Sequence, residues 1–115
     1  MSERSNREYL HDIQEASRRI ATYTAGMTEQ TFWEDSKTQD AVIRNLEIIG
    51  EATKNLTNEV RERYPEIPWK SMAGLRDRLI HNYFGVNLDI VWQIVVQELT
   101  KVSSQLEIIL NENNL

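Results

Sequence analysis

Four side chains that could do chemistry lie close together in the stretch "GLRDRLIHNYFG", residues 74 to 85: Arg76, Asp77, His81 and Tyr83. A histidine exchanges protons near neutral pH, and an arginine can hold a phosphate through two parallel hydrogen bonds. In RNA, a base that deprotonates the 2′-hydroxyl and a cation that stabilises the charge at the phosphate suffice for cleavage without a metal. Asp77 could hold the His81 ring in one tautomer, and Tyr83 adds a phenolic hydroxyl.

The spacing of these residues leaves two interpretations open. On an ideal helix Asp77 and His81 stand one turn apart on one face, whereas Arg76 and His81 are about 140° apart. A twofold axis would supply a second copy of each group and could join them in a shared cleft. The ordinary alternative is a surface pair of Asp77 and His81, with Arg76 and Tyr83 covering an apolar stripe. Spacing alone does not decide between them.

The elements that carry these residues are predicted to be helices. Apolar residues recur at helical spacing, and only two prolines and four glycines interrupt the chain. We expect one all-α domain over residues 1–115, an up-and-down bundle of four to five helices. The first helix begins with a capping box formed by Ser5 and Glu8 and ends at Gly26. Its predicted buried stripe is Tyr9, Ile13, Ala16, Ile20 and Tyr23.

A short amphipathic turn at "TEQTFWED" leads to the second helix. Ser36 and Gln39 have capping-box spacing, and Pro65 is expected to stop the helix at about Arg63. Gly50 in its interior predicts close backbone packing against a neighbour. The predicted buried stripe is Val42, Leu46, Ile49, Thr53 and Leu56.

The third and fourth helices follow the proline-bounded connection "YPEIPWKSM". Met72, Leu75 and Leu79 predict the buried stripe of the third helix, and Gly85 its end. For the fourth helix Asn87 is the expected N-cap, and the expected stripe is Leu88, Trp92, Val95, Leu99, Val102, Leu106 and Ile109. Because "DIVWQIVV" is apolar nearly all round, Ile90 and Ile94 supply a second face, from which we predict a homodimer.

Composition excludes several classes of protein. A formal net charge of −5 disfavours broad, nonspecific binding to nucleic acid but leaves room for a local basic cleft. The absence of cysteine rules out disulfides and thiolate metal sites. His11 belongs to no cluster with metal-ligand spacing, and no glycine-rich phosphate loop is present, so we expect neither a metal nor a cofactor. The apolar runs are too short to span a bilayer, which favours a cytoplasmic protein.

Glu47 and Glu51 share a helix face with Arg44. The simpler interpretation is an intrahelical, salt-bridged surface. The other is that these carboxylates line the same cleft as the 74–85 stretch. The sequence leaves both open.

The segments "RNLEIIGEATKNL" (44 to 56) and "PEIPWKSMAGLRDRLIHNYFGVNLDIVW" (65 to 92) strongly resemble the HepT family of HEPN-domain proteins. The resemblance covers nearly the whole chain. HEPN ribonucleases are marked by an arginine, then a polar residue, then a histidine after three to five further positions, and HepT proteins extend this pattern to RxxxxHxY. Arg76, Asp77, His81 and Tyr83 match it without departure. The flanking "PEIPW" and "IIGEA" segments make the match specific, since RxxxxH by itself is common in helical proteins.

The resemblance implies a helical, homodimeric toxin of a bacterial toxin–antitoxin pair that cleaves RNA without a metal at the dimer cleft. Arg76 and His81 would be its catalytic pair, supported by Asp77. The implied partner is a MntA-like minimal nucleotidyltransferase that silences the toxin by transferring AMP from ATP to Tyr83. The added phosphate and base would lie beside Arg76 and His81 and block RNA. The alternatives are a non-catalytic HEPN module that binds a nucleotide or docks a nucleotidyltransferase, and a purely structural dimer.

Overall fold

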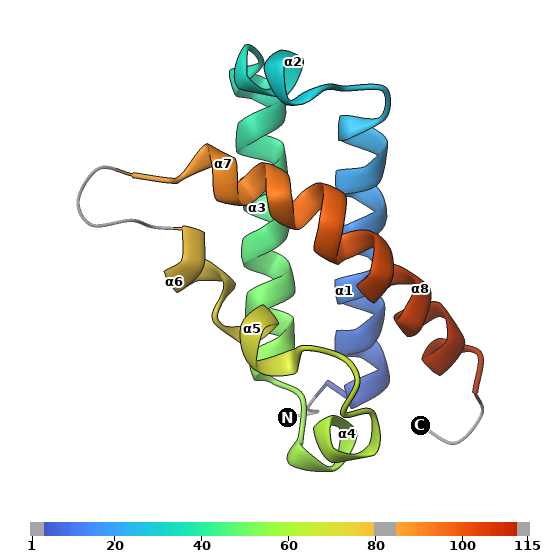
Figure 1. The fold of residues 1–115 in the computed structure, drawn as a ribbon. Helices are drawn as coiled ribbons and strands as arrows, with labels where there is room; N and C mark the ends of the chain where they lie inside the picture. Colours follow the sequence, from blue (N-terminus) through green and yellow to red (C-terminus); the bar gives the residue numbers. More distant parts are fainter. Residues whose placement is uncertain (1–3, 80–84, 113–115) are drawn as a thin grey trace.

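The computed structural model describes residues 4–79 and 85–112 (Figure 1). These residues are helical apart from turns, connecting loops and an isolated β-bridge at Val86. The all-α prediction is therefore confirmed. In chain order the helices are α1 (Asn6–Thr24), α2 (Glu29–Trp33), α3 (Ser36–Lys54), α4 (Asn58–Arg63), α5 (Trp69–Ala73), α6 (Leu75–Leu79), α7 (Leu88–Gln93), the π-helical turn η1 (Ile94–Glu98) and α8 (Leu99–Leu110).

Helices α1 and α3 run side by side along most of their lengths, and α7 to α8 cross them diagonally (Figure 1). The capping box at Ser5 and Glu8 is present, and the chain leaves α1 through Gly26, whose φ is +76°. The buried residues of α1 are Leu10, Ile13, Ala16, Ser17 and Ile20. Tyr23 was wrongly predicted to join them and is 41% exposed, because it lies about 80° round the helix from the centre of this stripe.

The long second helix was predicted to reach Arg63, but α3 ends at Lys54 and a separate α4 follows. The break is held by Asn6 of α1, whose side chain accepts from the Thr57 backbone N–H (3.1 Å) and donates to the Thr57 hydroxyl (3.0 Å). The N-cap is Asp35 rather than Ser36, and its carboxylate accepts from the Thr38 backbone N–H at 3.0 Å. The predicted stripe of α3 is fully buried, as expected.

The predicted third helix is two helices, α5 and α6, separated by a turn at Gly74. Met72, Leu75 and Leu79 are buried, which confirms the predicted stripe. The prediction that Gly50 packs closely is also confirmed, because a Cβ at that position would lie 3.3 Å from the Met72 carbonyl oxygen. The predicted continuation toward Gly85 falls on residues 80–84, outside the described residues.

The last helical segment begins at Asn87, whose side chain accepts from the backbone N–H groups of Asp89 and Ile90, as predicted. Val95 and the later stripe residues are buried, while Leu88 and Trp92 are half-buried. The prediction that Ile94 offers a face to a partner is wrong: it is 1% exposed within the single chain. Ile94 lies three residues after Val91, which is also buried, so the two share the face of the helix that packs into the core.

Candidate functional site

Helix α6 carries Arg76 and Asp77 and lies on its two leucines. Leu75 and Leu79 are 2% and 1% exposed and anchor the helix to the core. At 100° per residue, Arg76 and Arg78 project about 80° to either side of this leucine stripe. The two arginines of "RDR" therefore point toward different surroundings.

Arg78 is fully engaged. Its guanidinium forms two hydrogen bonds with the Glu98 carboxylate, at 3.1 Å to Oε1 and 2.8 Å to Oε2, and donates to the Ser71 hydroxyl at 2.7 Å. Fork-to-fork pairing of this kind orients both side chains. Arg78 is thus committed to contacts within the fold.

Arg76 is exposed and, within residues 4–79 and 85–112, has no hydrogen-bond or ion-pair partner. It lines a groove of about 330 Å³ between α1, α3 and the α5–α6 segment. The other charged residues lining this groove are Arg4, Asp12, Arg44, Glu47, Glu51 and Lys54. A guanidinium that is exposed and unpartnered is available to an anionic ligand.

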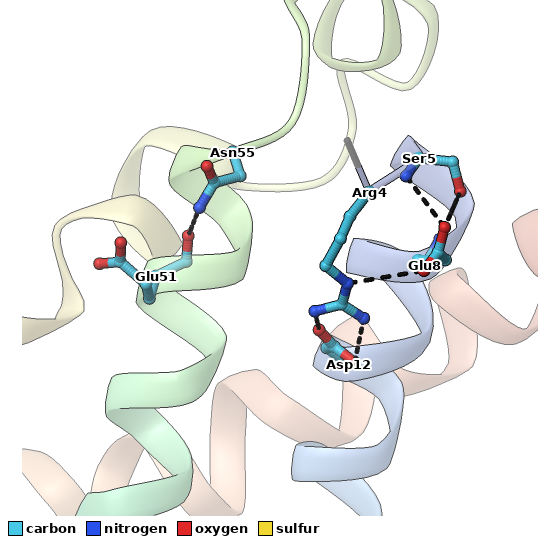
Figure 2. A network of polar contacts seen from close by, with 6 residues as sticks. All are labelled: Arg4, Ser5, Glu8, Asp12, Glu51 and Asn55. Carbon is cyan, nitrogen blue, oxygen red and sulfur yellow. Dashed lines mark hydrogen bonds and ion pairs between the residues drawn. The ribbon is translucent and has the colours of Figure 1, made fainter. Parts of the chain in front are cut away.

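Glu47 and Glu51 line the same groove as Arg76. Neither forms a salt bridge with Arg44 among the described residues, so the expected intrahelical pairing is absent there. Glu51 contacts Asn55 through its backbone and not its carboxylate: the side-chain amide of Asn55 donates to the backbone carbonyl of Glu51 at 2.9 Å (Figure 2). Of the two interpretations left open by the sequence, the structure therefore favours groove-lining carboxylates.

On the α1 side of the groove the charges are already paired. Figure 2 shows Arg4 lying along α1, where its guanidinium binds the carboxylates of Asp12 and Glu8. The Ser5 backbone N–H and hydroxyl both donate to Glu8 and lower the pKa of its carboxyl group. No pattern in the sequence pointed to Arg4 or Asp12, because their place in the groove depends on how α1 packs against α3.

Asp77 is exposed on α6 beside Arg76. His81 and Tyr83 lie outside the described residues, so their distances from Arg76 are not part of the structure. The described flanks of this segment meet: the Asn87 backbone N–H donates to the Leu79 carbonyl at 2.9 Å. This hydrogen bond joins the end of α6 to the start of α7.

The described part of the chain contains neither a metal site nor a membrane-spanning helix. No group of three or more His, Asp or Glu side chains there could hold a metal ion. No helix of residues 4–79 or 85–112 is long and apolar enough to cross a bilayer. Among the tryptophans, Trp69 is buried and Trp92 packs against Phe32 at 5.2 Å between ring centroids, whereas Trp33 is 47% exposed.

Comparison with known proteins identifies relatives of this chain. The family model "Ribonuclease HepT-like" matches residues 13–109. The chain is 46% identical to a protein of Thermococcus cleftensis named "Probable ribonuclease HepT", over 90% of this chain and 94% of the relative. It is 46% identical to a "Putative RNase" of Methanocaldococcus jannaschii (97% and 93% covered) and 41% identical to one of Caldanaerobacter subterraneus (92% and 95% covered).

No solved structure is significantly similar to the chain. The family match covers most of the sequence, including α3, α5 and α6 and the whole 74–85 stretch. The groove beside Arg76 is thus built from matched elements together with the start of α1. The chain belongs to the HepT-like ribonuclease family.

Proposed function

We propose that this protein is a metal-independent endoribonuclease, the toxin of a toxin–antitoxin pair, in which Arg76 and His81 are the catalytic residues and Asp77 supports them. The observation that carries the proposal is the different state of the two neighbouring arginines. Arg78 is engaged by Glu98 and Ser71, whereas Arg76 is exposed on the groove with no described partner. Family membership supplies the substrate class, RNA.

The proposed reaction needs only this chain's side chains. His81 accepts the proton of a ribose 2′-hydroxyl, and the 2′-oxygen attacks the adjacent phosphorus while Arg76 stabilises the added negative charge. The bond from phosphorus to the 5′-oxygen breaks, and that oxygen takes a proton from a second acid, for which a twofold copy of His81 is the candidate. The products are a 2′,3′-cyclic phosphate and a 5′-hydroxyl.

A homodimer is part of the proposal, because two copies of α6 facing one cleft would double the local positive charge. This arrangement offers a route to RNA binding for a chain whose net charge is −5. Since Ile94 is buried in the single chain, the proposed interface does not depend on it.

We further propose that a MntA-like nucleotidyltransferase antitoxin silences the enzyme. The Tyr83 hydroxyl oxygen would attack the α-phosphate of ATP, forming a tyrosyl–AMP ester and releasing pyrophosphate. The attached phosphate would then compete with RNA for Arg76. Intact mass after incubation with antitoxin and ATP should rise by whole AMP groups, and the Tyr83→Phe variant should gain none.

The cleavage test uses partner-free protein, end-labelled RNA and a chelator. Wild type and Arg19→Ala should cleave, whereas Arg76→Ala and His81→Ala should lose at least about 100-fold in rate, the scale expected for removal of a catalytic group. Arg19 is a matched control because it is an exposed arginine on α1 whose ion-pair partner among the described residues is the nearby Glu15. Equal inertness of wild type and all variants, with Tyr83 unmodified, would favour a non-catalytic binding module instead.

A further inference from the structure

We infer that Arg78 and Glu98 form a positioning pair that sets the rotation of α6 and thereby the direction in which Arg76 enters the groove. The inference rests on the proposed ribonuclease function and adds two residues to it. Neither side chain would touch RNA. Their role would be exerted through the short helix between them and Arg76.

Helix α6 needs such a restraint because of its length. It spans five residues, Leu75–Leu79, and its buried contacts come from one stripe of two leucines. Two anchors on one line hold a helix down but restrain its rotation about its own axis weakly. A lateral contact from a residue beside the stripe is required to fix the rotation, and Arg78 is in that position, about 80° from the stripe centre.

The lateral contact has the two-pronged geometry of a strong arginine–carboxylate pair. Both terminal nitrogens of Arg78 bind the Glu98 carboxylate, and one of them also reaches Ser71 on α5, so one side chain joins three elements. Among the described residues, no other α6 side chain makes a hydrogen bond or ion pair. The fork is about one-third exposed, with side-chain values of 33% for Arg78 and 37% for Glu98.

Glu98 is itself held in an unusual element. It is the last residue of the π-helical turn η1, and the Leu99 N–H binds the Ile94 carbonyl five residues back. Such turns are rare and occur frequently at functional sites. Here the π-helical turn carries the Glu98 carboxylate that binds Arg78, so the turn contributes to the contact that holds α6.

The expected effect follows from the size of the helix. Side-chain heads lie about 6 Å from a helix axis, so a rotation of about 10° moves the Arg76 guanidinium by about 1 Å. A misplacement of about 1 Å in a catalytic group can lower the rate about 100-fold. We therefore expect a tenfold to 100-fold loss in kcat when the fork is broken, with KM changed by less than about threefold.

The test compares Arg78→Lys, which keeps the charge but loses the fork, and Glu98→Gln, which keeps the shape but loses the charge, in the full-length protein. Glu107→Gln is the matched control, an exposed glutamate on α8. The charge-exchanged double variant, Arg78→Glu with Glu98→Arg, should recover part of the kcat lost in either single exchange. Each rate is divided by the concentration of folded protein, measured by circular dichroism, so that a loss of stability is not mistaken for a loss of activity.

A second measurement does not depend on activity. Backbone hydrogen exchange in residues 74–79 should become several-fold faster in Arg78→Lys and Glu98→Gln, while exchange in α1 and α3 stays as in wild type. If wild type cleaves no RNA, the ribonuclease proposal fails and this exchange result alone decides whether the pair restrains α6. Unchanged exchange in α6, or faster exchange with wild-type kcat in an active enzyme, would overturn the inference.

Discussion

Replacing Gly50 with alanine probes the contact that places α5 and α6 on α3. The new Cβ would lie 3.3 Å from the Met72 carbonyl oxygen and 3.6 Å from the Leu75 Cβ. The nearer atom belongs to the backbone, so it cannot rotate away as a flexible side chain would. The α5–α6 segment must therefore shift by a few tenths of an ångström to admit the methyl group.

Two opposing terms set the size of the effect. Alanine is favoured over glycine in a helix interior by about 1 kcal/mol. Overpacking a close contact typically costs about 1–3 kcal/mol. We expect the second term to win because backbone has to move, with a net loss of about 1 kcal/mol and a Tm lower by about 4 °C.

Urea unfolding followed by circular dichroism measures the change, and the same helix supplies the control. Glu47 is exposed in the middle of α3, so the difference between Glu47→Ala and Glu47→Gly reports helix propensity without any clash. If Gly50→Ala stabilises the protein by the same amount as alanine gains over glycine at position 47, the contact is not tight and the reasoning is wrong.

Two further perturbations test the core and a helix start. Leu79→Ala should lower the free energy of unfolding in urea by about 2–5 kcal/mol, because it leaves a cavity beneath α6. Ile108→Ala, at a position 66% exposed, should change this free energy by less than about 0.5 kcal/mol. A larger effect at Ile108 than at Leu79 would contradict the assigned core. The backbone N–H of Thr38, and after it the Thr38 hydroxyl, donate hydrogen bonds that lower the pKa of Asp35 below its ordinary 3.8. The Asp35 carboxylate therefore stabilises the fold above that pH and loses its contribution as the pH falls through the lowered pKa. The Tm advantage of wild type over Asp35→Asn should accordingly shrink between pH 7 and pH 2, and a constant difference would refute this linkage.

Helix starts and buried stripes were predictable where the signal is local. The capping box of Ser5 and Glu8 and the cap at Asn87 depend on side chains within three residues of each other, so the sequence contains all their partners. The stripe of α3 follows from a 3.6-residue period that one chain segment defines by itself.

Helix ends were predicted less well, because distant residues decide them. The long second helix breaks where Asn6, 51 residues away, binds Thr57. The expected partner face at Ile94 failed because Ile94 shares the face of buried Val91 and packs into the chain's own core. The sequence near Thr57 contains no sign of Asn6, and a segment that is apolar nearly all round does not indicate which of its faces packs into the core.

Residue types and their spacing were sufficient to predict the helical class, the groups available for chemistry and the family, because each of these depends on local sequence. The packing of the helices determined which arginine of "RDR" is available to a ligand, since Arg78 binds Glu98 twenty residues along the chain while Arg76 has no partner among the described residues. It also decided that Glu47 and Glu51 share a groove with Arg76, because that groove forms only when α1, α3 and α6 pack together. A side chain's availability depends on what the fold brings beside it, and spacing along one segment does not contain that information.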